Sequence, residues 1–396
     1  MPVNRRRPGM PSAPLGLSEL SLQLRRILRN WLRGALSSHG TYNKYLAKLS
    51  LYPSKEWFAS SYDKLSIPKP QIGGADSRTN TIKIEMSNHT KVTYFIIKGI
   101  SDDPNLQLPI FLLVLFMYII TLGGNMTIFL LICLDRHLHT PMYFFLSNLS
   151  IMDMSSTTVT LHRILVKYVT GNGTISFFCC MTQVYFFSSI TGDQLLLLTA
   201  MSYDRYAAIC MALRYPIVMN SKTCGLLAIV CWMLGFLQVI PYIILLSSYT
   251  CYRSNYVNHF YCDLVPVMKL SCSDTSALEI LIFTEGLLLL NLTPCLLTFI
   301  SYVFIIVTIL RIQTKIGRRK AFYTCSSHLI VVLFLYITLG CQYLAPVSTN
   351  TVISYKLFSL FNTAAVPMVN PLIYSLRNND VKSAFGRRVK YFRALI

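Results

Sequence analysis

Seven apolar runs of bilayer-spanning length dominate this chain from residue 86 onwards. They cover approximately Ile110–Leu134, Met142–Val166, Cys180–Cys210, Cys224–Leu246, Ala277–Ile312, Ala321–Ala345 and Tyr355–Leu376. A helix needs about 20 residues to cross the hydrocarbon core, and a lone lipid-exposed segment satisfies its backbone hydrogen bonds only as a helix. The runs are too long and too evenly apolar for the strands of a membrane barrel. One run alone would also suit a buried core helix, but seven in succession predict an all-α, seven-transmembrane helix bundle.

The composition of the chain fits a membrane protein better than a soluble one. Hydrophobic residues make up 53% of its 396 residues and charged residues only 13%, whereas soluble domains carry about 25% charged residues. The formal net charge is +20, which suits either nucleic acid or an anionic membrane surface. Because the basic residues lie between the apolar runs, they favour the membrane surface, and we expect no nucleic-acid partner.

Basic residues near the ends of the runs predict the orientation of the chain. If the segment that starts at Met86 lies outside, 15 Lys or Arg residues fall near the inner ends of the runs and 7 near the outer ends. An excess of positive charge marks the cytosolic side. We therefore predict an extracellular N-terminus and a cytoplasmic C-terminus with a short amphipathic tail helix. The glycosylation sequon that begins at Asn88 falls on the predicted outer side.

Residues 1–85 differ from the rest because they contain no run long enough to span a bilayer. They hold 14 Lys or Arg and 5 Asp or Glu residues, and apolar residues recur at helical spacing only over residues 17–31. This weak amphipathic pattern lacks the compact apolar core of a signal peptide. We interpret residues 1–85 as a disordered extension or a mis-called exon before a start at Met86, and residues 86–396 as the transmembrane domain. A transit-like or membrane-surface segment is the alternative for residues 1–85.

Four motifs lie in or beside the apolar runs. They read PMYFFLSNLS at residues 141–150, MSYDRYAAIC at 201–210, KAFYTCSSH at 320–328 and PMVNPLIYSLRN at 367–378. Together with Asp153, they closely resemble the signature sequences of vertebrate odorant receptors, a family of rhodopsin-like G-protein-coupled receptors, and they occur in that family's order. The resemblance extends from about Met86 to the C-terminus. It implies a receptor in the plasma membrane whose partners are a small-molecule odorant and a stimulatory olfactory G protein that raises cyclic AMP, with no enzymatic activity and no cofactor.

The sequence Asp204-Arg205-Tyr206 places an acid and a base at the cytosolic end of the third run. An isolated charge is costly in the membrane, so these two side chains are candidates for a pair. Judged without the neighbouring motifs, Arg205 is equally well explained as an anchor at the membrane interface. The resemblance implies that the pair is a latch: the arginine is released on activation and contacts the G protein, while Tyr302 and Tyr374 move towards it.

A second set of polar residues lies inside the apolar runs. Asp153 is in the second run, Asn125 in the first and Asn370 in the seventh, and polar groups at such depth usually mark function. The resemblance implies a water-filled or sodium-binding network that favours the inactive state. Many members of that family carry an acid at the position of Gln194, so the amide weakens the prediction of sodium binding here.

Cysteine residues gather on the predicted outer side. Cys180 begins the third run, and Cys251, Cys262 and Cys272 lie in the loop after the fourth run, on the oxidising side of the membrane. Four cysteines permit three pairings, and the sequence alone does not choose among them. The resemblance implies the bridges Cys180–Cys262 and Cys251–Cys272, which would fold the loop as a lid over the helices. The alternative is a soft-metal site at His259 and Cys262; we expect no metal, because a disulfide would consume Cys262.

Ligand recognition in a helix bundle needs a mostly apolar cavity with a few polar groups between the helices. Pro294 and Pro371 favour kinks, which would act as hinges at the two ends of such a pocket. We count helix turns inward from Cys180 and apply the same logic to the later runs, and family analogy adds the deeper Tyr336. The predicted lining residues are Phe187, Ser188, Thr191, Gly192, Phe283, Gly286, Leu287, Tyr336, Leu339, Tyr343, Leu360 and Thr363. The set contains no obvious cation, so we predict a neutral, rather apolar ligand. The alternative is that most of these side chains only pack.

Other functional classes make different predictions from the same chain. A transporter should show inverted repeats and paired half-helices interrupted by glycine or proline. An enzyme should show a phosphate loop, a His-Glu-x-x-His run or a nucleophile elbow. The sequence has none of these features. A rhodopsin-like receptor for a hormone or peptide is the closer alternative, and the four motifs disfavour it.

Overall fold

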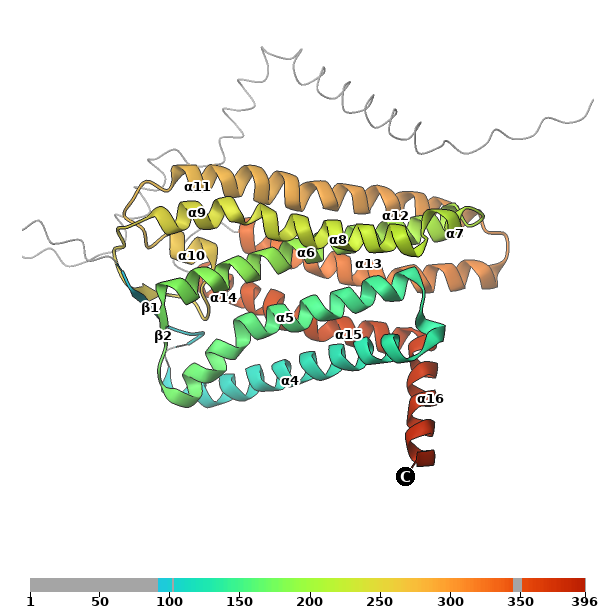
Figure 1. Ribbon diagram of the computed structural model, residues 1–396, viewed down its shortest axis with the longest axis horizontal. Coiled ribbons are helices and arrows are strands. Elements are labelled where there is room, and N and C mark those ends of the chain that lie inside the picture. Colours follow the sequence, from blue (N-terminus) through green and yellow to red (C-terminus); the bar gives the residue numbers. More distant parts are fainter. Residues whose placement is uncertain (1–91, 102, 345–350, 396) are drawn as a thin grey trace, which may run out of the picture. The chain divides into compact units, whose positions relative to one another are not determined.

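The structure is a computed structural model that describes residues 92–101, 103–344 and 351–395. Seven helical segments of bilayer-spanning length follow one another in the described residues (Figure 1). They are α4 (Pro104–Leu134), α5 (Pro141–Thr170), α6 (Phe177–Cys210), α8 (Ser221–Gln238) with α9 (Ile240–Ser248), α11 (Ser276–Leu281) with η2 (Ile282–Leu292) and α12 (Thr293–Arg311), α13 (Lys315–Leu344), and α14 (Thr351–Leu360) with η3 (Phe361–Ala365) and α15 (Val366–Arg377). The predicted seven-helix architecture is confirmed. The predicted extension at residues 1–85 and the sequon at Asn88 lie outside the described residues.

Local signals explain where several of these helices begin and end. Asp103 precedes Pro104 and accepts a hydrogen bond from the amide of Asn105 at 2.9 Å, so it caps α4. Asn220 caps α8 in the same way, by accepting from the amide of Thr223 at 2.9 Å. Such side chains satisfy amide groups that have no partner in the first turn of a helix. At the other end of α5, Gly171 adopts a left-handed conformation with φ of 70°, which favours glycine.

Three of the seven segments change their helical geometry just before a proline residue. The fourth segment breaks between α8 and α9, directly before Pro241. The fifth runs as a π-helix through η2 until Pro294, and the seventh does so through η3 until Pro367. Proline cannot donate the backbone hydrogen bond of a regular helix and crowds the preceding turn. The sequence analysis anticipated a change at Pro294, but it placed the change in the seventh segment at Pro371, which lies inside α15, and it did not anticipate the break at Pro241.

Helix α13 begins six residues earlier than predicted. The sequence analysis began the sixth run at Ala321, whereas the helix begins at Lys315 and includes the basic residues 315–320. Hydrophobicity marks only the part of a helix that lies in the hydrocarbon core. Lys and Arg are good helix formers, so the helix continues beyond the apolar run.

The polarity of α5 and α6 follows from their position in the packing. Segments α4, α8–α9, α12, α13 and α14–α15 contain stretches long and apolar enough to cross a membrane by composition. Helix α5 has 30 residues and carries Asp153. Helix α6 has 34 residues and carries Asp193 and Asp204. Both helices pack against several neighbours. For example, α6 contacts α5, α8, α12 and α13. Charged residues in membrane helices face other helices rather than lipid, and the buried carboxyl groups of the described helices all lie on these two.

Short elements cover the two ends of the bundle. At the outer end, β1 (Tyr94–Ile97) pairs antiparallel with β2 (Thr174–Ser176) and parallel with β3 (Tyr256–Val257), and α10 (Leu264–Met268) follows β3. At the inner end, η1 (Arg136–Leu138) joins α4 to α5, and α7 (Tyr215–Val218) joins α6 to α8. The last helix, α16 (Asn379–Leu395), turns away from the direction of α15 and contacts η1 and α4 (Figure 1). It is the predicted tail helix.

The close approach of α6 and α8 makes Gly235 a sensitive position. A methyl group at Gly235 would lie 1.6 Å from Asp193 Oδ1 and 2.9 Å from the backbone oxygen of Ser189. We expect Gly235→Ala to reduce the free energy of unfolding by about 1–3 kcal/mol, as overpacking does, and to lower the Tm of the purified protein. Gly225→Ala is the matched control on the same helix, because a methyl group there meets no atom within 4 Å.

A second substitution tests the contact itself. Asp193→Ala removes the carboxylate that crowds the new methyl group, so it should restore part of the Tm that Gly235→Ala loses. Strictly additive losses in the double variant would contradict the assigned packing, since contacting residues are expected to couple.

Candidate functional site

Asp153 of α5 is the centre of a hydrogen-bonded cluster inside the bundle. Its side chain is fully buried. Asn370 of α15 donates to Asp153 Oδ2 at 2.8 Å, and Gln194 of α6 donates to Oδ1 at 2.9 Å. An intramolecular hydrogen bond contributes about 0.5–1.5 kcal/mol to stability. The side chain of Asp153 therefore joins α5 to α6 and to α15, which lies more than 200 residues later in the chain.

Asn125 of α4 serves a different purpose from the one predicted. The sequence analysis placed it in one polar network with Asp153, but its amide donates to the backbone oxygens of Thr121 and Pro367, both at 3.0 Å. The carbonyl of Pro367 has no donor four residues later, because Pro371 lacks an N–H. Asn125 thus satisfies the backbone oxygen that Pro371 leaves free, and it ties α4 to α15.

The cytosolic end of α6 carries a closed ion pair. Arg205 Nε donates to Asp204 Oδ2 at 3.0 Å, and a second guanidinium nitrogen donates to the same oxygen. The hydroxyl of Tyr215, in α7, donates to the other oxygen of Asp204 at 2.8 Å. The side chain of Asp204 is fully buried and that of Arg205 is 12% exposed. Both carboxylate oxygens are occupied, so the arginine is held on its own helix.

The two tyrosines named with this pair lie near it but do not bond to it. Tyr302 of α12 shares a 2.6 Å hydrogen bond with Nδ1 of His328 on α13, and both side chains are buried. Tyr374 of α15 is 2% exposed, and its hydroxyl has no hydrogen-bond partner among the described residues. Tyr206 packs its ring against Tyr203 and Phe304. The arrangement leaves the Arg205 pair separate from both tyrosines.

The outer loop is fixed to the bundle by two disulfides. The structure pairs Cys180 with Cys262 and Cys251 with Cys272, at Cα–Cα distances of 5.5 and 5.4 Å. These are the pairs that the resemblance implied. Because Cys262 is bonded to Cys180, its sulfur is not available as a metal ligand beside His259, and the described residues contain no cluster of three metal-ligating side chains.

Buried side chains hold the same loop to α6 and α14. Gln183 accepts from the amide of Cys262 at 2.8 Å, and the hydroxyl of Tyr355 donates to Asp263 Oδ2 at 2.7 Å. His259 is 1% exposed and lies 3.3 Å through Nε2 from the hydroxyl of Ser359. These contacts extend the loop over the helix ends, as expected for a lid.

Several predicted ligand residues are buried or half-buried in the helix bundle. Phe187 packs edge-on against Tyr261 of the lid, with ring centroids 4.9 Å apart. Leu339 is 3% exposed and Thr363 is fully buried, while Leu360 packs in the same apolar cluster as Phe187. Three others are half-buried: Ser188, Thr191 and Tyr336. This subset remains the predicted ligand site.

Three other predicted residues face elsewhere. Gly192 lies against Gln238 of α8, whose amide nitrogen would be 1.9 Å from an added methyl group. Phe283 is 40% exposed, and Gly286 faces the hydroxyl of Tyr242 in α9. Phe283 and Gly286 lie in η2, where π-helical hydrogen bonding changes the number of residues per turn, so counting by α-helical turns selects the wrong face. The side chains of Leu287 and Tyr343 are outside the described part of the chain.

Residues that the sequence analysis did not assign complete these clusters. His328 is the last residue of the KAFYTCSSH motif, so the sequence could have indicated it. Tyr215 lies 11 residues after Asp204, and no motif or periodic pattern connects the two. Between α13 and η3, Asn362 accepts from Thr338 and donates to Gln342. This chain of neutral polar groups neighbours the predicted ligand residues Leu339 and Thr363.

The sequence model of the olfactory receptor family matches residues 114–390. The chain belongs to the olfactory receptor family. Human olfactory receptor 6C1 is 44% identical over 310 residues, covering 78% of this chain and 99% of the relative. Human olfactory receptor 6C3 is 46% identical over 298 residues, covering 75% and 96%.

A solved structure supports the fold independently. The crystal structure of squid rhodopsin superimposes with a TM-score of 0.59 at 17% identity, covering 74% of this chain and 88% of rhodopsin. The olfactory receptor described here is therefore a multi-pass membrane protein with the rhodopsin-like fold, and its family comprises signalling receptors rather than enzymes.

His259 makes the stability of the receptor's lid depend on pH. Burial, helped by the nearby positive charge of Lys356, lowers the pKa of His259 from 6.5 to about 3. The folded state thus favours the neutral ring, and its contribution to stability is complete above pH ~6.5 and declines as the pH falls towards 3. We expect the Tm of the purified receptor to fall between pH 7.5 and 5.

A His259→Asn variant separates this effect from that of the neighbouring acid. Burial raises the pKa of Asp263, so its contribution to stability changes with pH in the opposite direction. The variant should show a flatter Tm profile than the wild type over the same pH range. Parallel profiles for the two proteins would exclude His259 as the source.

Proposed function

We propose that this olfactory receptor binds a small, neutral volatile ligand between its helices and activates a heterotrimeric G protein of the stimulatory olfactory type, which raises cyclic AMP. The plasma membrane is the proposed location. The observation that carries the proposal is the buried Asp204–Arg205 pair at the cytosolic end of α6, closed by Tyr215, in a chain that belongs to this receptor family.

The ion pair supports a switch because its alternative partners are close in the fold. In the proposed active state, Arg205 leaves Asp204 and contacts the G protein, while Tyr302 and Tyr374 move towards it. A ligand favours that state only if its contacts differ between the two arrangements of the helices. Binding at the outer side and G-protein binding at the inner side then strengthen each other reciprocally.

Basic residues favour the inner face as the G-protein docking surface. We propose that Arg205, Arg214, residues 315–320 and the tail after Arg377 form this surface. Much of the Lys315–Lys320 segment is exposed as the first turns of α13. Positive charge attracts acidic partners at long range, and the proposed surface combines it with the arginine that the switch releases.

The charges near the predicted ligand residues support a neutral ligand. Lys356 donates to the backbone oxygen of Gly99 at 2.9 Å, and Lys167 donates to that of Lys98. Burial keeps His259 neutral at physiological pH, as its pKa of about 3 requires. The amide and hydroxyl groups of Thr338, Gln342 and Asn362 are polar without charge, which suits an alcohol, ketone or ester better than an acid.

Loosening the latch should raise signalling in the absence of ligand. Tyr215→Phe removes one hydrogen bond to Asp204, and the loss of such a bond favours the open state by about threefold to tenfold in population. We expect a comparable rise in basal cyclic AMP in cells, at equal surface expression. Tyr256→Phe, on the exposed outer strand β3, is the control. Arg205→Gln should abolish the response, and unchanged basal activity in Tyr215→Phe would contradict the latch.

The ligand class can be tested with an odorant panel of matched chain lengths. Cells that express the receptor, either from Met1 or from Met86, are challenged with neutral odorants and with the corresponding carboxylic acids while cyclic AMP is measured. We expect responses to neutral members that are lost in Arg205→Gln. A response confined to strong acids would refute the neutral ligand, and silence despite confirmed surface expression would count against the odorant assignment.

A further inference from the structure

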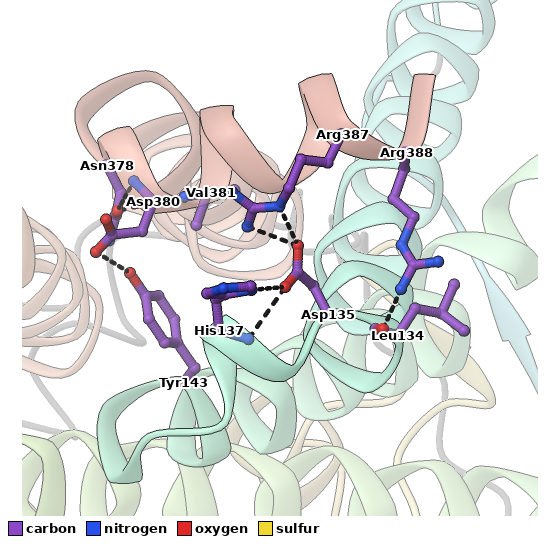
Figure 2. Close-up of polar contacts among 9 residues, drawn as sticks. All are labelled: Leu134, Asp135, His137, Tyr143, Asn378, Asp380, Val381, Arg387 and Arg388. Atoms are coloured by element: carbon purple, nitrogen blue, oxygen red, sulfur yellow. Dashed lines mark hydrogen bonds and ion pairs between the residues drawn. The ribbon is translucent and has the colours of Figure 1, made fainter. Parts of the chain in front are cut away.

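A shallow hollow of about 410 Å³ opens at the cytosolic end of α4, where this helix meets η1 and α16. Six residues line it: Leu134, Asp135, Arg136, His137, Arg387 and Arg388. Figure 2 shows the arginines of α16 reaching down towards the end of α4. The lining therefore contains three guanidinium groups and a single carboxylate.

That carboxylate is already neutralised within the protein. Arg387 donates through Nε and Nη2 to Asp135 Oδ2 at 2.9 and 2.7 Å, and His137 lies 3.0 Å from Oδ1 (Figure 2). Burial alone would raise the pKa of Asp135, but the hydrogen bonds from Arg387 and His137 outweigh it and lower the pKa to about 2. Asp135 is thus ionised and fully engaged, and Arg387 is its partner.

Two positive charges in the hollow remain uncompensated. Arg136 is exposed and forms no ion pair with any described residue. Arg388 donates to the backbone oxygen of Leu134, a neutral group, and no described acidic residue pairs with it (Figure 2). Guanidinium groups bind phosphate through paired hydrogen bonds, so the hollow offers two suitable donors to an anion.

The contacts of α16 hold these donors in place. The hydroxyl of Tyr143 donates to Asp380 at 3.2 Å, and Asn378 accepts from the amide of Asp380 at 2.9 Å at the start of the helix (Figure 2). Val381 and Ala384 of α16 are buried, so one face of this helix packs against the protein. The arginines are therefore presented by a docked helix rather than by a free tail.

An apolar stripe on α4 leads from the lipid to the same hollow. Met126, Leu130 and Leu134 are 46%, 47% and 53% exposed, and their spacing of four residues places them on one face of the helix. In a membrane-spanning helix, this exposed face contacts acyl chains. The charged hollow lies at its inner end, where lipid headgroups of the cytoplasmic leaflet are found.

We propose that the hollow binds the phosphate-bearing headgroup of an anionic phospholipid of the cytoplasmic leaflet. Arg136 and Arg388 contact the phosphate, and an acyl chain of the lipid lies along Met126, Leu130 and Leu134. The bound lipid joins α16 to α4 and stabilises the inner face of the receptor.

The test uses the full-length receptor in nanodiscs, without odorant and without G protein. The Tm is measured in phosphatidylcholine alone and with increasing mole fractions of phosphatidylinositol 4,5-bisphosphate. The anionic lipid should raise the Tm of the wild type. Arg136→Gln should increase the mole fraction needed for half of this rise by about fivefold, the loss expected for one basic residue near an anionic surface.

Matched variants make the result specific. Lys390→Gln removes the same charge from an exposed position of α16 outside the hollow and should change the lipid response far less than Arg136→Gln. Arg388→Lys keeps the charge and should retain binding, whereas Arg388→Gln should weaken it. Equal effects of Arg136→Gln and Lys390→Gln would indicate general surface attraction and overturn the proposal.

Two further outcomes would also overturn it. If soluble inositol trisphosphate raised the Tm as much as the lipid does, the ligand would be a free phosphate and the stripe on α4 would have no part. If Arg136→Gln left the lipid response intact and, in a separate assay with G protein, reduced activation in phosphatidylcholine alone, the hollow would be a protein contact. Because the Tm is read without odorant, the result does not depend on the proposed signalling function.

Discussion

The hydrocarbon core of a bilayer offers no hydrogen bonds, and this constraint decides where the polar groups of the receptor lie. Asp153 has two amide donors from two other helices, and Asn125 satisfies the carbonyl that Pro371 leaves without a donor. Hydroxyl groups such as that of Thr121 return to the carbonyl one turn earlier on their own helix. Helix α6 carries Asp193, Gln194 and Asp204, so it can lie only where neighbours surround it.

The sequence was sufficient to predict the helices because their signals are local. Apolar runs of spanning length mark the segments, although the predicted starts at Ile110 and Cys224 lie beyond the caps Asp103 and Asn220 at which the helices begin. It was also sufficient for the centre of the polar cluster, since an acid inside an apolar run stands out. The early start of α13 at Lys315 was missed because hydrophobicity reports the membrane core and not the helix.

What the sequence could not supply is the rotation of each helix about its axis. Gly192 lies next to the predicted interior position Thr191, yet it faces α8, since each residue turns the helix by about 100°. The π-helical η2 shifts the face of Phe283 and Gly286, and no pattern in the residues announces it. Partners such as Tyr215 and Asp204 are joined across a turn between helices, so only the fold brings them together.

Helix α6 makes bonds at the outer end, in the middle and at the inner end of the receptor. Near its outer end, α6 is bonded to the lid through Cys180, and Gln183 accepts from the same loop. Midway, Gln194 joins it to Asp153, and at its inner end Asp204 holds Arg205. Energetic coupling between distant sites requires an element with two arrangements that both sites influence. The disulfide at Cys180 joins the outer end of α6 to the lid, and we infer that the element that changes is a helix connected to α6 rather than α6 itself.

We infer that this element is α15, which is joined to α6 through the side chain of Asp153. Its Pro371 interrupts the backbone hydrogen bonds, and a side chain of another helix, Asn125, replaces the missing donor. A hydrogen bond supplied by a neighbouring side chain can break while the helical turn stays wound. Breaking a backbone hydrogen bond within a regular helix unwinds the turn. Asn370 and Tyr374 lie on the same short helix, one bonded to Asp153 and the other buried without a partner among the described residues. A shift of α15 therefore alters the bond to the polar cluster and the position of a tyrosine near Arg205 in one movement.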